Sequence, residues 1–132
     1  MGPGTFWREI VNRATLEQFA EEFVPDVTFE TSSCNRVVRG PADMRTLLLA
    51  MGSLYTSLAF ISETDTRVGT YLEWAGIASG GEVAGVTVVE WGSSLRISAV
   101  RLHQRPLFAV VRFAAKLAGQ NLPGFSAADF EC

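Results

Sequence analysis

The chain has few of the residues that build metal sites and disulfide frameworks. Its 132 residues include one histidine, His103, and two cysteines, Cys34 and Cys132. A structural zinc site takes about four Cys or His ligands, so we expect no metal, and no motif indicates another cofactor. The first residues, MGPGTFWREI, lack the apolar segment of a secretory signal peptide. We therefore expect two unrelated free thiols in a cytoplasmic protein.

Basic clusters and long hydrophobic runs are also missing. The formal charge is −3, and the 11 basic residues are spread from Arg8 to Lys116. Nucleic-acid-binding surfaces need clustered basic residues, and a membrane-spanning helix needs roughly 20 apolar residues in a row. We expect neither nucleic acid nor a membrane as a partner. The chain instead has 48% hydrophobic and 19% charged residues, which is typical of a single globular domain over residues 1–132.

The segment from Thr70 to Arg105 predicts three consecutive long strands. Two turns interrupt it, Ser79-Gly80-Gly81 and Gly92-Ser93-Ser94, and glycine supplies the positive φ that tight hairpin turns require. Each strand would have about ten residues, or roughly 33 Å of extended chain. Long strands twist and coil, so we expect a curved sheet that encloses a pocket.

The N-terminal half predicts helices that cover this sheet. Two short helices are expected within residues 5–23, because a threonine at 15 precedes a glutamine at 18 in the pattern of a capping box. A strand is expected at 26–31, a helix at 41–51 and a further strand at 58–67. The apolar positions of the second and third helices recur at the spacing of one helix face.

The end of the chain is less regular. The last strand moves its apolar side from Ile97 to Val100 and Leu102, which indicates a bulge or burial on both faces. Pro106 opens a closing helix that is apolar nearly all round, so this helix is expected to be buried or to lie in an interface. Residues 119–132 are expected to form a loose tail.

Several local motifs follow each other in this order: FVPDVTFETSS over 23–33, VVRGPADMRTLL over 37–48, then YLEW, GGEVAGVTVV, LRI and RPL. Together with the order of elements, they resemble the nuclear-transport-factor-2-like superfamily, which includes SnoaL-like polyketide cyclases, ketosteroid isomerases and limonene-epoxide hydrolases. The resemblance covers about residues 6–117. It implies an α+β fold, a cystatin-like cone whose curved antiparallel sheet wraps around N-terminal helices, here with an extra C-terminal helix.

The resemblance also indicates which family chemistry is missing. It places Thr31 where ketosteroid isomerases carry an aspartate general base, and Trp7 and Thr87 where they carry their oxyanion donors. A threonine hydroxyl is not a base near neutral pH without help. The Asp–Arg–Asp set of limonene-epoxide hydrolases is not apparent either. The chain is therefore not expected to be a standard ketosteroid isomerase, although Trp7 and Thr87 could still bind an oxygen atom.

Alternation along the strands predicts an inward face that suits an apolar ligand. The residues expected to contact this ligand are Trp7, Phe29, Thr31, Leu72, Trp74, Thr87, Val89, Val100 and Leu102. In the simpler interpretation, the two tryptophans only fill the core. The two threonines then occur there because threonine favours β-strands.

Three functions stay open. The first is a SnoaL-like pocket domain that binds a small, mostly apolar molecule. The second is an acid–base enzyme of isomerase, polyketide cyclase or epoxide hydrolase type, with Thr31, Thr87, Glu63, Asp65 and His103 as weak catalytic candidates. In the simpler interpretation, the two carboxylates lie at a solvated edge of the sheet. The histidine then lies on the outer face of the sheet.

The third function is a structural dimerisation module. Val86 and Val88 fall on the outer face of the sheet, beside the apolar closing helix. Exposed apolar patches of this kind mark interfaces, so we expect a homodimer through the outer sheet face.

Overall fold

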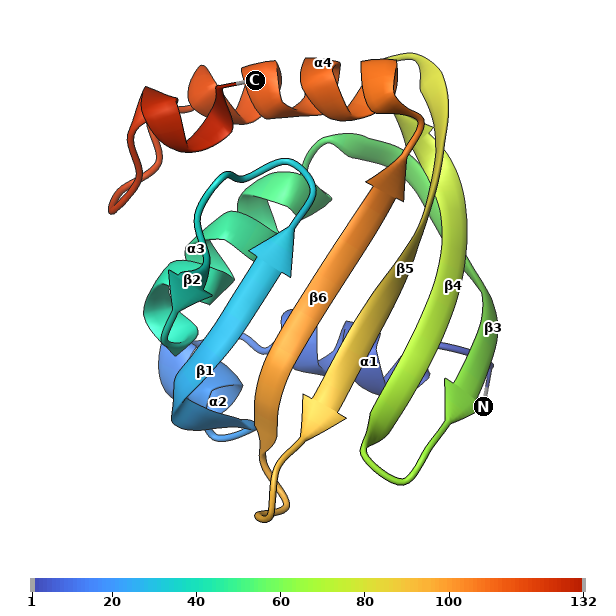
Figure 1. Ribbon diagram of the computed structural model, residues 1–132, viewed down its shortest axis with the longest axis vertical. Coiled ribbons are helices and arrows are strands. Elements are labelled where there is room, and N and C mark those ends of the chain that lie inside the picture. Colours follow the sequence, from blue (N-terminus) through green and yellow to red (C-terminus); the bar gives the residue numbers. More distant parts are fainter. Residues whose placement is uncertain (1, 132) are drawn as a thin grey trace.

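The computed structural model describes residues 2–131, which form a curved six-stranded sheet with helices on its concave side (Figure 1). The sheet order is β2-β1-β6-β5-β4-β3. The elements are α1 (Thr5–Val11), α2 (Leu16–Ala20), β1 (Phe23–Thr31), β2 (Val38–Arg39), α3 (Pro41–Gly52), β3 (Tyr55–Asp65), β4 (Gly69–Ala78), β5 (Gly81–Trp91), β6 (Ile97–Arg105), α4 (Leu107–Ala118) and the 3-10 turn η1 (Ala127–Phe130). Within residues 2–131, no helix is both long and apolar enough to cross a membrane.

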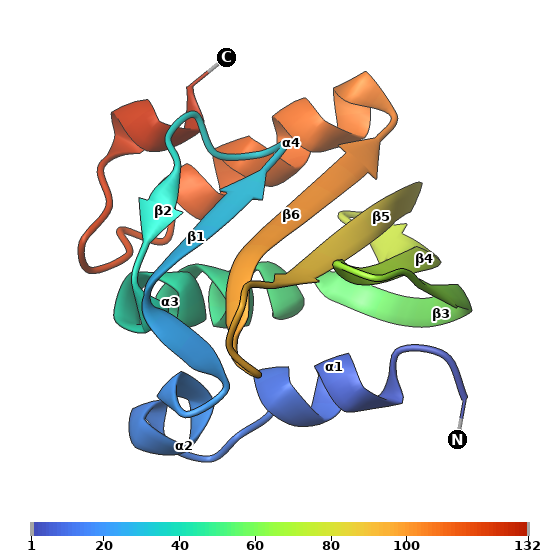
Figure 2. The same ribbon diagram turned by 60° about the horizontal axis from the view of Figure 1, so that its bottom comes forward.

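The four long strands β3 to β6 form an antiparallel meander. Its last three strands, β4 to β6, are the ones that the two glycine turns predicted. β1 returns beside β6 as a parallel neighbour and pairs antiparallel with the short β2. Figure 2 shows α1 and α3 beneath the sheet, while α4 crosses one open end of the cone. The helices thus close a space that the curvature of the sheet begins to enclose.

Two strands begin earlier than their sequence patterns predicted, β1 at Phe23 and β3 at Tyr55. In both cases an irregularity hides the alternation. The pairing of β1 with β6 shifts between Phe23 and Thr28, a stretch that accommodates Pro25. The pairing of β3 with β4 shifts between Tyr55 and Ser57 and again beyond Phe60. Each shift moves the following side chains relative to a regular period of two.

The predicted inward face is the buried face. Phe29, Leu72, Val89 and Val100 are fully shielded from solvent. Thr87 is almost as deeply buried, at 1% exposure. Local alternation was sufficient for these positions because each lies in a regular stretch of its strand.

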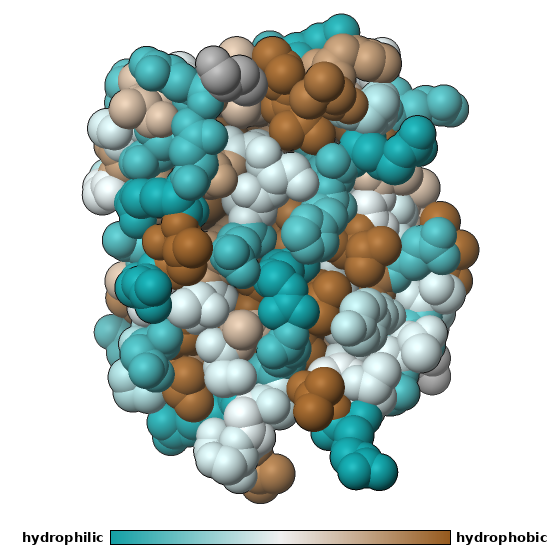
Figure 3. Space-filling view, viewed as in Figure 1, coloured by the Kyte–Doolittle hydropathy of each residue, from teal (hydrophilic) through white to brown (hydrophobic). Residues whose placement is uncertain are grey.

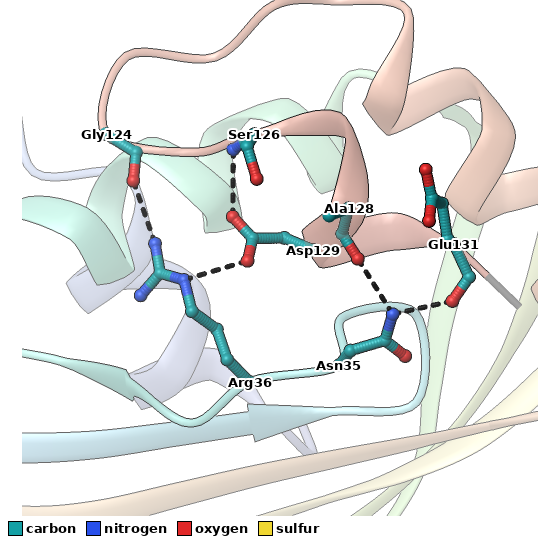
Figure 4. Close-up of polar contacts among 7 residues, drawn as sticks. All are labelled: Asn35, Arg36, Gly124, Ser126, Ala128, Asp129 and Glu131. Atoms are coloured by element: carbon teal, nitrogen blue, oxygen red, sulfur yellow. Dashed lines mark hydrogen bonds and ion pairs between the residues drawn. The ribbon is translucent and has the colours of Figure 1, made fainter.

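The C-terminal tail is fastened to the connection between β1 and β2, which corrects the expectation of a loose tail (Figure 4). The Asn35 side-chain amide donates hydrogen bonds to the carbonyl oxygens of Ala128, at 3.0 Å, and Glu131, at 2.6 Å. Arg36 forms an ion pair with Asp129 at 3.2 Å. Its guanidinium also donates to the carbonyl of residue 124. These partners are about 90 positions away in the chain, so the tail sequence alone did not indicate them.

Apolar packing accompanies the polar contacts of the tail. Phe130 is 5% exposed, and its ring stacks on Phe125 with centroids 5.9 Å apart. The tail therefore extends the hydrophobic core around the end of α4. Cys34 is a free, buried thiol in the same region, while Cys132 lies outside the described residues.

Candidate functional site

A small apolar cavity of about 90 Å³ lies inside the cone, between the sheet and the helices α1 and α3. Its lining residues are Trp7, Val11, Leu48, Met51, Gly52, Tyr55, Leu58, Phe60, Trp74, Thr87 and Leu102. Pockets for drug-sized ligands typically measure about 300–1,000 Å³. The enclosed space by itself therefore accommodates only a very small molecule.

A second hollow of about 330 Å³ adjoins the cavity. The two share five lining residues, Trp7, Val11, Gly52, Leu58 and Phe60, and the second adds Arg8 and Asn12. It is the mouth of the cavity, between α1 and the edge strand β3. A ligand that occupies both spaces would place its inner part among apolar side chains and its outer part near the polar groups of α1.

Trp74 forms the floor of the cavity through an interaction with two residues of β5. Its indole Nε1 donates a hydrogen bond of 3.1 Å to Oγ1 of Thr87, and both residues are buried. The ring lies against Gly85, where a β-carbon would come within 2.4 Å of its Cζ2 atom. Gly85 is therefore required for this indole position. Since a threonine hydroxyl both accepts and donates, the Thr87 hydrogen remains available to a ligand.

Tyr55 forms the wall beneath α4. Its ring packs edge-on to Trp74, with centroids 5.7 Å apart, and also contacts Phe113 of α4. The phenol donates a hydrogen bond to Oε1 of Gln104. Burial raises the pKa of Tyr55, so the phenol stays protonated and acts as a donor, not a base.

Two buried polar atoms near this layer have no hydrogen-bond partner among the described residues: Oγ1 of Thr31 and Nε2 of Gln104. Thr31 is 8% exposed, but it is not among the residues that line the cavity. Thr31 pairs with the lining residue Leu102 but does not itself line the cavity, and among the described residues no carboxylate belongs to the lining.

The mouth is held by contacts between α1 and β3. Arg8 donates a 3.0 Å hydrogen bond to the carbonyl of Leu58, and its Cζ lies 5.1 Å from the ring centroid of Phe60. At the start of α1, the Gly4 amide donates to the Glu63 carboxylate at 2.9 Å. Glu63 is thus a fastening point for the N-terminal segment and does not line the cavity.

The structure brings four of the nine predicted ligand contacts to the cavity wall: Trp7, Trp74, Thr87 and Leu102. The other five are buried in the core and are not lining residues: Phe29, Thr31, Leu72, Val89 and Val100. Tyr55, Leu58 and Phe60 were missed. Strand irregularities obscure the alternation of these residues in β3, and the predicted strand began only at residue 58.

The remaining catalytic candidates lie away from the cavity. Asp65 is exposed and accepts a 2.8 Å hydrogen bond from the Thr70 hydroxyl. His103 is exposed and pairs with Val86, whose side chain belongs to the outer face. Within residues 2–131, no cluster of three or more His, Cys, Asp or Glu side chains is arranged to hold a metal ion.

Several solved structures have an architecture similar to that of this chain. No protein-family model matches the sequence, and no curated protein matches it. An uncharacterised protein with a cystatin-like fold from Silicibacter pomeroyi has a TM-score of 0.76 and 14% identity, over 85% of this chain and 79% of its own. A steroid delta-isomerase from Pseudomonas aeruginosa also has a TM-score of 0.76 and 14% identity, over 87% and 85%. A protein of the SnoaL-like family from Agrobacterium tumefaciens has a TM-score of 0.56 and 14% identity, over 76% and 92%.

At this identity the likeness extends to the fold alone. The chain has the α+β, cystatin-like fold that the sequence motifs predicted, and it shares this fold with solved structures of NTF2-like and SnoaL-like proteins. A curved sheet, N-terminal helices inside it and an additional C-terminal helix are all present.

Proposed function

We propose that this NTF2-like chain is a cytoplasmic small-molecule-binding domain whose ligand is mostly apolar and carries one oxygen atom. The observation that carries the proposal is the cavity wall around Thr87, where the hydrogen-bonded pair of Trp74 and Thr87 lies among mostly apolar side chains. Ligand sites commonly combine apolar walls with a few placed polar groups that fix orientation.

The Thr87 hydroxyl supplies the specificity. Its oxygen accepts from the Trp74 indole, so its hydrogen is directed elsewhere and can donate to a ketone or ether oxygen. Trp7 and Leu102 supply apolar contact in the same cavity wall. Because the inner cavity is small, the ligand extends through the mouth between α1 and β3.

Binding is better supported than acid–base catalysis. Among the described residues, no carboxylate or imidazole belongs to the cavity lining. A positioned general base typically contributes about 10²–10⁴-fold to a proton transfer, and Thr31 cannot supply it. We expect the unmodified chain to leave a ketosteroid unchanged. The Thr31→Asp, Thr87→Asp double variant, assayed for steroid isomerisation beside it, tests whether two added carboxyl groups are enough to give this fold the activity. Turnover by the unmodified chain would contradict this assignment.

The proposal is tested with cyclohexanone and methylcyclohexane as matched probes that differ in the oxygen atom. Indole N–H signals of the ¹⁵N-labelled protein report on both probes. We expect cyclohexanone to shift the signals of Trp7 and Trp74 more than that of Trp91, which is not a lining residue. Methylcyclohexane should bind more weakly.

A pair of threonine variants separates recognition from general packing. Thr87→Val should remove the preference for the ketone, because valine has the shape of threonine without its hydroxyl. Thr64→Val, at an exposed position of β3, should leave the preference intact. If neither probe shifts the Trp7 and Trp74 signals at millimolar concentration, the binding proposal is wrong.

A further inference from the structure

The outward side of α4 carries an uncovered apolar stripe. Leu107 is 79% exposed, Phe108 61% and Val111 41%. Ala115, one turn further along, is also exposed. Figure 3 shows hydrophobic side chains gathered over α4 at the top of the molecule. At the helical spacing of 3.6 residues per turn, these four positions fall on one side of α4.

The opposite side of α4 already packs on the core. Its buried residues are Ala109, Val110, Phe113, Ala114 and Leu117. Only Arg112 and Lys116 interrupt the apolar character of the helix. A helix that is apolar on both sides needs a partner on each, and the cone supplies only one of them.

The stripe has both protrusions and a hollow. Leu107 and Phe108 protrude at the N-terminal end of α4. At the other end, a hollow of about 400 Å³ separates the stripe from the tail. Its lining residues are Val111, Ala115, Ala118, Ala127, Phe130 and Glu131. The tail therefore borders the stripe at the C-terminal end of α4.

The charges beside the stripe are self-complementary. Lys116 is exposed on one flank of α4. Glu131 belongs to the tail, which packs along the opposite flank beside Ala118. Arg112, on the same flank as Lys116, points back over the Phe108 ring and toward the carbonyl of Ser79. The positive Lys116 therefore lies on one side of the apolar stripe, and the negative Glu131 lies on the other side.

We propose that this α4 stripe, consisting of Leu107, Phe108, Val111 and Ala115, is the interface of a two-fold homodimer. A two-fold axis along the helix direction brings each flank of one copy against the opposite flank of the other, so Lys116 of each copy meets Glu131 of its partner. An anionic membrane is a poorer match, because a membrane-bound helix carries basic residues along its whole polar boundary, and here Glu131 is acidic.

The outer face of the sheet is less suited to this contact than its sequence pattern indicated. Val88, one of the two valines expected to be exposed there, is 5% exposed within the single chain. Arg101 and Glu90 form an ion pair on the same face, beside the exposed His103. Pairing through this face would bury charged groups that already have partners, at a cost in desolvation. The helix stripe has no such cost.

The test is sedimentation velocity of the full chain at micromolar concentrations. We expect a dimer, and we expect Val111→Glu to convert it to a monomer with an unchanged circular dichroism spectrum. Tyr71→Glu, at an exposed position on β4, is the matched control on the sheet face and should leave the dimer intact. A monomeric wild type, or a dimer lost in Tyr71→Glu but kept in Val111→Glu, would overturn the proposal.

A charge exchange gives a second, independent readout. Lys116→Glu and Glu131→Lys should each weaken association about tenfold or less, as expected for exposed ion pairs. The double variant Lys116→Glu, Glu131→Lys should restore it, since each pair is re-formed with its signs reversed. Failure of the double variant to recover would exclude the two-fold arrangement described above. Co-sedimentation of a monomeric wild type with anionic phospholipid vesicles would assign the stripe to a membrane and contradict the dimer.

Discussion

Trp74 on β4 and Gly85 on β5 face each other across paired strands, and the indole occupies the space that a β-carbon at position 85 would need. The contact fixes the ring where its Nε1 reaches Thr87. The floor of the cavity therefore depends on the absence of a side chain at one position.

Gly85→Ala is expected to destabilise the fold by about 1–3 kcal/mol, the usual cost of overpacking a well-packed core. The added carbon would come within 2.4 Å of the indole and 2.3 Å of the carbonyl oxygen of His103. Gly81→Ala on the same strand is the control, because its nearest neighbour would be the Arg112 guanidinium at 3.8 Å. Urea denaturation measures the unfolding midpoint of both variants. Equal midpoints for the two variants would contradict the packing described for Trp74.

Thr87→Val is expected to cost about 1–3 kcal/mol, because it leaves the buried Trp74 N–H without an acceptor. In a Trp74→Phe background this cost should largely disappear, since phenylalanine has no N–H to satisfy. A double-mutant cycle on the free energy of unfolding isolates the coupling between the two residues. A coupling energy near zero would show that the hydrogen bond does not contribute to stability.

Phe130→Ala is expected to cost about 3–5 kcal/mol, as for other buried aromatic residues. A loose tail would give almost no effect. Leu95→Ala is the matched control, because Leu95 is 98% exposed, and surface substitutions usually change stability by about 0.5 kcal/mol or less. If both variants unfold at the wild-type midpoint, the tail does not belong to the folded core.

Burial raises the pKa of the Cys34 thiol, with the nearby Asp129 carboxylate adding to the effect and the Arg36 backbone and guanidinium opposing it. The thiol is expected to stay protonated in the folded chain at pH values where an unfolded thiol ionises. The folded state then retains a proton that the unfolded state has lost, so stability falls as the pH rises above about 8.5.

Reactivity toward a disulfide reagent measures this protonation directly. The Cys132→Ser variant removes the second thiol, and Cys34 should then react slowly at mildly alkaline pH until denaturant is added. The Cys34→Ala, Cys132→Ser variant should lose less stability between neutral pH and about pH 9.5. Rapid labelling of Cys34 in the folded chain would contradict the assigned burial.

More residues of the buried sheet face than of the cavity lining could be predicted from the sequence. Phe29, Leu72 and Thr87 could be assigned to the interior because alternation in a regular strand requires only neighbouring residues. Tyr55 and Phe60 could not, because register shifts in β3 interrupt that alternation at the mouth of the cavity. The tail contacts of Asn35 were also out of reach, since they join segments more than 90 residues apart.

By itself, then, the sequence determined the order of helices and strands, the inward face of the sheet and the absence of a general base at Thr31. These properties depend on local periodicity, turn chemistry and residue identity. Only the tertiary structure decided how little space remains around Trp74, and that the outer side of α4 stays uncovered. Both depend on how side chains from distant segments pack together, and hydrophobic patterning alone does not specify that packing.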